Sequence, residues 1–304
     1  MPSRNIKLML VATHPADSFD QAGGTLAHHI ARGDSATVVI ATTGVRSHHW
    51  KLADQKRAAG ADVDVEEMVK EAVEEKLEEV RKACRILGFE DLRDLGFEDD
   101  DILVTQDKIE AIADAIREVK PDILISHHPY ETGGLKMHAT IGQCTVLASQ
   151  IAAGSGRGRQ ERHNVPVIYF MNPQSYVGNN SLEYAGTGRT DLYVDITDVI
   201  DKKVEALDQI STQFYGGPYA RKRAETEDGS WGQKALTAYA EQFQRFQPMV
   251  LHTLPITDAE LDRITLPSAD MMTRRGEVVG GIMPLPEGME YSSAQRVPAE
   301  KYRL

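Results

Sequence analysis

The fold is decided by the stretch THPADSFDQAGG at residues 13–24 and by the apolar run IKLMLVA at residues 6–12 that precedes it. The apolar run predicts a buried strand, and TLAHHIA at residues 25–31 predicts a helix that ends near Gly33. The polar stretch then forms a loop at the C-terminal end of the strand. In an open α/β sheet this is the edge at which ligands bind.

His14 and Asp17 are the residues of this loop whose side chains suggest a metal site. A neutral imidazole and a carboxylate together suit zinc or a similar divalent ion. Gly23 and Gly24 are expected to let the N-terminus of the following helix approach the loop closely. A polar loop with an N-cap aspartate is the alternative interpretation, because aspartate is common before a helix.

A second strand end carries three more histidines. Residues 121–134, PDILISHHPYETGG, contain a strand that runs into a polar loop with His127 and His128, and His138 follows at the head of another helix. Two such strand ends can meet at one edge of a parallel sheet. We therefore predict one metal site with an open position for water, as in catalytic zinc centres, formed by His14, Asp17 and His138.

The rest of the chain alternates between the two kinds of element. Further strands are predicted at residues 36–41, 92–95, 165–170 and 192–196, and helices at 62–87, 106–119, 138–153, 198–214 and 231–246. This alternation predicts an α/β fold, a Rossmann-like parallel sheet with helices on both faces and an irregular C-terminal extension. We expect a catalytic domain at residues 1–215. A C-terminal helix and extended tail, residues 216–304, should pack on the same domain or on a neighbouring subunit of a homo-oligomer.

Two further polar segments lie where strands are predicted to end. The loop after the strand at residues 36–41 carries His48 and His49, and a role in the site and an exposed polar loop are equally good interpretations of this pair. The acidic run EDDD at residues 98–101 could bind a cation, but a solvated turn is the simpler interpretation.

Composition limits the possible partners. The chain has 304 residues, of which 41% are hydrophobic, so it can bury a sizeable core. A net charge of -12 argues against nucleic acid and anionic membranes as partners. The two cysteines, Cys84 and Cys144, are expected to be buried thiols. No apolar run approaches the ~20 residues of a membrane span, and we expect no signal peptide. These features favour a cytoplasmic protein that acts on a small molecule.

The two histidine motifs resemble those of the LmbE-like or PIG-L-like zinc-dependent de-N-acetylases. The usual first motif of that family is Ala-His-Pro-Asp-Asp-Glu before a glycine pair, and this chain has Thr-His-Pro-Ala-Asp-Ser at residues 13–18. The second motif of the family is a loop with a metal-binding histidine just before a helix, as at His138. The resemblance implies a site for zinc, or another divalent metal, at the three ligands named above.

The departures from the family motif concern the proton carrier. Ala16 stands where the family has its usual general base, and Ser18 stands where it has glutamate. The metal ligands are therefore present while the usual base is absent. The His-x-Ala-Asp variant is similar to that of 4-oxalomesaconate hydratase, a zinc-dependent relative that adds water to a carbon–carbon double bond. The loop at residues 42–49 offers no carboxylate, which weakens a close match to that hydratase.

The resemblance implies three possible functions. A deacetylase-like hydrolase of an N-acyl group on a small polar substrate comes first. The alternatives are a zinc-dependent hydratase of an unsaturated oxo-dicarboxylic acid and a non-catalytic ligand-binding member of the family. Without an aspartate at position 16, another group must carry the proton. Asp20 is one candidate, but it lies on the first helix, where it is expected to point away, so the histidines are the better candidates. His128 is preferred because it lies further from its strand, and the complete set of candidates is His128, His127, His48 and His49.

Overall fold

The structure is a computed structural model that describes residues 4–59, 65–130, 136–155, 161–173 and 189–276. Residues 131–134 of the second histidine loop and residues 277–304 of the predicted tail lie outside the described residues. Cys84 and Cys144 are both buried and free, as predicted. Among the helices of the described segments, none is long and apolar enough to cross a bilayer.

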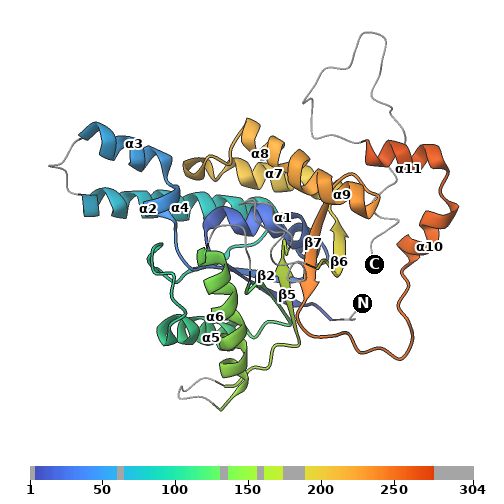
Figure 1. Ribbon diagram of the computed structural model, residues 1–304, viewed down its shortest axis with the longest axis horizontal. Helices are drawn as coiled ribbons and strands as arrows, with labels where there is room; N and C mark the ends of the chain where they lie inside the picture. Colours follow the sequence, from blue (N-terminus) through green and yellow to red (C-terminus); the bar gives the residue numbers. More distant parts are fainter. Residues whose placement is uncertain (1–3, 60–64, 131–135, 156–160, 174–188, 277–304) are drawn as a thin grey trace, which may run out of the picture.

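One seven-stranded sheet forms the centre of the fold, with the strand order β3-β2-β1-β4-β5-β7-β6 (Figure 1). The strands are β1 (Lys7–Ala12), β2 (Ser35–Ile40), β3 (Asp91–Asp94), β4 (Ile123–His127), β5 (Val167–Met171), β6 (Leu192–Asp195) and β7 (Ala240–Arg245). The five strands β1 to β5 pair in parallel, whereas β7 runs antiparallel to both β5 and β6. The predicted α/β class is confirmed, and one end of its parallel sheet is completed by two antiparallel pairings.

Helices cover both faces of the sheet, as predicted (Figure 1). The helices are α1 (Pro15–Ala31), α2 (Val45–His48), α3 (Trp50–Ala59), α4 (Val65–Leu87), α5 (Gln106–Val119), α6 (Lys136–Ala153), α7 (Ile200–Asp208), α8 (Pro218–Arg223), α9 (Gly229–Ala235), α10 (Asp258–Thr265) and α11 (Ser268–Arg275). Short helical turns are η2 (Thr197–Val199), η3 (Ser211–Gln213) and η4 (Ala224–Asp228).

The central strand β1 divides its side chains between two cores because successive residues of a strand point to opposite faces. Leu8 and Leu10 enter the core that α1, α4, α7 and α8 cover. Met9 and Val11 enter the core under α5 and α6. A continuous apolar run was therefore the correct signal for a strand that is buried on both faces.

Helix α1 begins earlier than the sequence predicted. The polar stretch is not a loop, because Pro15 is the first residue of α1 and Asp17 lies in its first turn. Proline suits this position, since its missing N–H would have no partner within the helix. The Asp17 side chain also accepts the His14 N–H at 2.8 Å, which stabilises the start of the helix. The glycine pair lies inside α1 and does not bring its N-terminus to the site.

The predicted helix at residues 231–246 is wrong. Helix α9 ends at Ala235, Leu236 adopts a left-handed conformation with φ 62°, and β7 follows. Tyr239 and Phe243 are buried in the core as strand-region residues, so their spacing of four does not mark a helix face. The predicted helix at residues 198–214 is also broken, into η2, α7 and η3.

The boundary expected at residue 215 stays a prediction. Strand β7 lies between β5 and β6, so the chain beyond that residue contributes to the central sheet. Beyond β7, α10 and α11 form the irregular extension at one side of the molecule (Figure 1).

The strand order reverses between β1 and β4. From β1 the chain adds β2 and β3 on one side, and β4 is then placed on the other side of β1. In doubly wound sheets a crevice forms outside the carboxyl ends of the strands at this reversal. The fold therefore directs the segments after β1 and β4 to one place.

Candidate metal centre

His14, Asp17 and His138 meet in this crevice. Asp17 Oδ2 lies 3.4 Å from His14 Nδ1 and 3.2 Å from His138 Nε2. Ligand atoms of the three residues all lie within 4.8 Å of one another, and all three side chains are buried. The Thr13 hydroxyl donates to the Met137 carbonyl at 3.5 Å, which joins the end of β1 to the first turn of α6. The structure thus brings together the three residues that the sequence predicted as ligands.

The charge of this cluster suits a cation. Burial alone would raise the pKa of Asp17, but the charge of His138 and the polar contacts of the carboxylate with His127, His138 and His14 hold that pKa well below its usual value. The carboxylate is therefore ionised in a buried place. Buried carboxylates are paired or coordinate a metal, and two imidazoles with one carboxylate form a donor set that zinc accepts.

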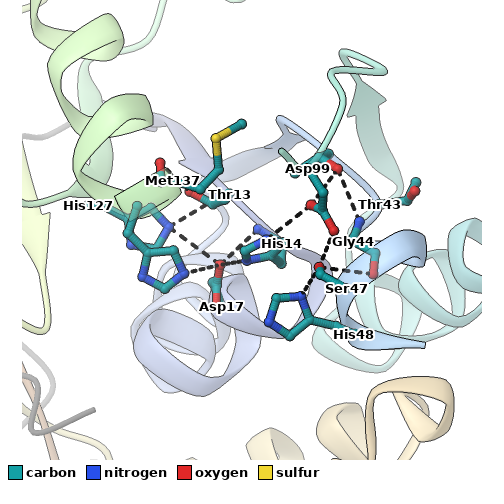
Figure 2. A network of polar contacts seen from close by, with 12 residues as sticks. Thr13, His14, Asp17, Thr43, Gly44, Ser47, His48, Asp99, His127 and Met137 are labelled. Carbon is teal, nitrogen blue, oxygen red and sulfur yellow. Dashed lines mark hydrogen bonds and ion pairs between the residues drawn. The ribbon is translucent and has the colours of Figure 1, made fainter. Parts of the chain in front are cut away.

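His127 supports the cluster from behind. Its Nε2 accepts the Thr13 N–H at 3.0 Å (Figure 2). Its ring stacks on the His138 ring with the centroids 4.0 Å apart. The side chain is fully buried. These contacts place His127 beside a predicted ligand, in a position to hold the His138 ring.

His128 lies in a different environment. Its Nδ1 accepts the Tyr130 N–H at 3.1 Å, and its ring packs edge-on against Phe170 with the centroids 5.2 Å apart. These described contacts place the His128 ring against the neighbouring strand β5. The structure does not place His128 in the cluster of three ligands.

The structure separates the pair His48 and His49. The His48 ring lies 4.4 Å from the His14 ring, and burial together with His14 lowers the pKa of His48 to about 4. His49 instead accepts the Leu52 N–H at 3.0 Å, and its Nε2 lies 3.6 Å from Glu75 Oε2. His48 therefore belongs to the site, while His49 stabilises the start of α3.

Asp99 is a site residue that the sequence interpretation missed. Its run was interpreted as a solvated turn, but the Asp99 side chain is only 6% exposed and Oδ1 lies 3.3 Å from His14 Nε2. It also accepts a hydrogen bond from Thr42 and one from Ser47 (Figure 2). The available signal was its position just after a parallel strand, at the same edge as the histidines.

Lys76 is a second residue that the sequence did not reveal. It is fully buried on α4 and donates a 2.7 Å hydrogen bond to the Thr43 carbonyl. Its position continues the apolar stripe of Ala72 and Val80 at a spacing of four, which was the signal for a buried side chain. Burial lowers its pKa to about 8.

A cavity of about 240 Å³ opens onto the cluster. Its lining residues are His14, Asp17, His48, Gln213, Phe214, Tyr215 and Tyr219. Among the described residues that line it, none is a lysine or an arginine. Phe214 is 60% exposed and stacks on Trp50, which gives the cavity an aromatic wall.

A buried carboxylate holds this wall in place. Glu79 of α4 accepts the N–H and the hydroxyl of Thr212 in η3, at 3.0 and 2.6 Å. Glu79 also accepts the Ser211 hydroxyl at 2.7 Å. Because η3 directly precedes Phe214, these bonds position the aromatic side of the cavity.

Several known proteins that resemble this chain in sequence are enzymes. The profile of the PIG-L family, described as GlcNAc-PI de-N-acetylase, matches residues 9–149. A probable N-acetyl-alpha-D-glucosaminyl L-malate deacetylase 2 of Bacillus cereus is 29% identical over 66% of this chain and 80% of its own length. A 4-oxalmesaconate hydratase of Pseudomonas putida is also 29% identical, over 67% of this chain and 73% of its own.

The solved structures agree on the fold. The crystal structure of GalB, the 4-carboxy-2-hydroxymuconate hydratase of Pseudomonas putida, has a TM-score of 0.64 at 23% identity, over 82% of this chain and all of its own. The N,N'-diacetylchitobiose deacetylase of Pyrococcus horikoshii has the same TM-score at 17% identity, over 83% of this chain and 88% of its own. The predicted resemblance is thereby confirmed, and the chain is an enzyme whose residues 9–149 match the model of the PIG-L family.

Proposed function

We propose that this protein is a metal-dependent hydrolase that removes an N-acyl group from a small, uncharged substrate. The observation that carries the proposal is the buried set of His14, Asp17 and His138 beside a cavity whose described lining residues include no lysine or arginine. A divalent ion bound there would supply a Lewis acid for the acyl carbonyl and would lower the pKa of water.

The lining of the cavity favours an uncharged substrate. An unsaturated oxo-dicarboxylic acid carries two carboxylates, which arginine or lysine would normally bind. The described lining is instead neutral or acidic apart from its histidines, and the net charge of the chain is -12. Phe214 and Tyr219 offer exposed aromatic faces, which suit the apolar face of a ring next to the acyl group.

The absence of the usual base favours the hydratase as the second candidate. Ala16 is fully buried in the hydrophobic core and cannot accept a proton. Of the four histidines predicted as proton carriers, we propose His48, because it lines the cavity with His14 and Asp17. His127 and His49 accept backbone N–H groups, and His128 lies against Phe170.

The test compares the two reactions on zinc-loaded protein. Neutral N-acetyl amino sugars and neutral N-acyl arylamines should release a free amine, whereas unsaturated oxo-dicarboxylic acids should not be hydrated. Turnover of the dianions alone would overturn the proposal in favour of the hydratase. Loss of metal and of turnover is expected in His14→Ala and His138→Ala, with His28→Ala, an imidazole on the outer part of α1, as the matched control.

The role of His48 is tested in the same assay. His48→Gln should keep its metal and lose about 10²–10⁴-fold in kcat. His49→Gln is the matched control, because His49 faces Glu75 and not the cavity. Equal kcat values for His48→Gln and the wild type would assign the proton transfer to another group.

A further inference from the structure

We propose that Asp99 is a positioning residue that fixes the hydrogen-bonding state of two histidines at once, His14 and His48. The proposal rests on the metal site proposed above. Asp99 lies in the segment after β3, and its two carboxylate oxygens face different partners (Figure 2). One oxygen acts on the predicted metal ligand, and the other acts through Ser47 on the predicted proton carrier.

The first oxygen selects which nitrogen of His14 is free to bind a metal. Asp99 Oδ1 lies 3.3 Å from His14 Nε2, and the Thr42 hydroxyl donates to the same oxygen at 2.9 Å. Asp17 lies at a similar distance, 3.4 Å, from Nδ1, but a cation bound between Nδ1 and Asp17 would exclude a proton from that nitrogen. Asp99 then holds the remaining imidazole proton on Nε2, and the lone pair of Nδ1 binds the ion. Nδ1 is the nitrogen that faces Asp17. Asp99 therefore directs His14 toward the set that contains Asp17 and His138.

The second oxygen acts on His48 through a hydroxyl. Ser47 Oγ donates its only proton to Asp99 Oδ2 and lies 2.5 Å from His48 Nδ1. Since the hydroxyl proton is used by the carboxylate, the remaining bond must be donated by His48 Nδ1–H to Ser47 Oγ. The lone pair of His48 is then on Nε2, which leaves that nitrogen to accept a proton.

A backbone feature keeps these groups together. Gly44 has φ +66°, and a Cβ at this position would lie 3.0 Å from His14 Cδ2 and 3.4 Å from His48 Nδ1. A side chain would be strained there by both the left-handed conformation and the short contact. The loop after β2 can therefore bring Ser47 and His48 against His14 and Asp99.

A direct role of Asp99 as a ligand is the competing interpretation. His14, His48 and Asp99 also have ligand atoms within 4.8 Å of one another. His14 Nε2 cannot both donate a proton to Asp99 and bind an ion. The His14, Asp17 and His138 set is the more buried of the two, which favours Asp99 as the residue that orients a ligand.

The experiment replaces Asp99 by asparagine, which keeps the shape and removes the charge. Zinc affinity, measured by competition with a chelating dye, should weaken by about 10–100-fold, the usual effect of losing a carboxylate behind a ligating histidine. Asp100→Asn is the matched control, because its side chain is exposed one residue further along. Loss of binding as complete as in His14→Ala would overturn the proposal, and so would an affinity equal to that of the wild type.

The nuclear magnetic resonance of the histidine nitrogens tests the same point without a substrate. In the zinc-loaded wild type, His14 should be protonated at Nε2 and His48 at Nδ1. Ser47→Ala should change the signals of His48 and lower turnover while leaving those of His14 and the zinc affinity unchanged. The opposite protonation of His14 would contradict the proposal. Because these signals need no turnover, failure of every N-acyl substrate would reject the proposed hydrolase and leave this result standing.

Discussion

Lys76 and Lys203 are both fully buried lysines, yet their surroundings differ. Lys203 Nζ lies 2.8 Å from Asp228 Oδ1 and 2.9 Å from Glu241 Oε1. Lys76 Nζ donates to the Thr43 carbonyl. The carboxylates of Asp99, Glu79 and Asp17 attract its charge electrostatically. Burial lowers the pKa of each, but the two carboxylates raise that of Lys203 above its usual value, whereas that of Lys76 falls to about 8.

The charge of Lys203 therefore stabilises the fold, whereas the charge of Lys76 lies beside the candidate site. Glu241 also accepts the N–H groups of Gly24 and Thr25 at 2.8 Å, so the Lys203 cluster joins α1, α7 and β7. Lys76 lies behind the segment that carries His48, where its positive charge faces Asp99 and Asp17. A buried ionisable group with a shifted pKa near a cavity indicates a functional environment.

The largest effect is expected from Lys203→Met. The substitution leaves Asp228 and Glu241 buried without their cation, and breaking a buried ion pair in this way costs about 3–5 kcal/mol. Urea unfolding followed by circular dichroism measures the loss. Lys202→Met, at the exposed neighbouring position of α7, should change stability by about 0.5 kcal/mol or less. A small effect of Lys203→Met would show that the cluster does not hold the fold.

A different signature is expected for Lys76, namely a dependence on pH. Its pKa is about 8 in the folded protein and 10.5 in the reference state. Between these values the unfolded chain binds the proton and the folded chain does not, so stability increases as the pH rises. The wild type should gain about 3 kcal/mol relative to Lys76→Met from pH 8 to 10.5.

Unfolding of both proteins at several pH values measures this gain. Lys70→Met is the matched control, because Lys70 lies on the exposed face of the same helix and should leave the slope unchanged. Parallel stability curves for the wild type and Lys76→Met would mean that Lys76 titrates as an exposed lysine, and the contrast with Lys203 would fail.

The same contrast explains what the sequence could predict. Buried strands at β1, β2 and β4 were visible because each is apolar on both faces. Strand β7 was not visible, because its sequence AEQFQR places Glu241 and Gln242 in buried positions. Glu241 is tolerated there only because Lys203 and two N–H groups of α1 meet it, and these contacts are tertiary.

The site was predictable where its residues share a short motif. His14 and Asp17 are neighbours across one helical turn, and His138 follows a strand at the same edge. Asp99 reaches His14 from the segment after a different strand, β3, so its partner is 85 positions away in the sequence. Whether His48 or His128 faces the site depends on rotations of the chain after β2 and β4, which residue types do not specify.

The smallest effect is expected at the glycine pair of α1, which packs on the Lys203 region. A Cβ at Gly24 would lie 2.5 Å from Ile196 Cγ2 and 2.7 Å from its Cβ. A Cβ at Gly23 would lie 3.3 Å from Lys203 Cγ. Alanine improves helix propensity by about 1 kcal/mol at either position, so the difference between the two variants isolates the contacts.

Gly24→Ala should destabilise the protein by about 1–3 kcal/mol, because Ile196 is fully buried and can move only with the core. Gly23→Ala should be nearly neutral if the Lys203 stem shifts by a few tenths of an ångström. The charged end of that stem is held by Asp228 and Glu241, so some of the shift must strain those ion pairs. Urea unfolding of Gly23→Ala in the wild type and in the Lys203→Met background measures this strain. If Gly23→Ala destabilises the wild type but not the Lys203→Met variant, the Lys203 cluster is rigid. If the destabilisation is the same in both backgrounds, the strain lies elsewhere along α1.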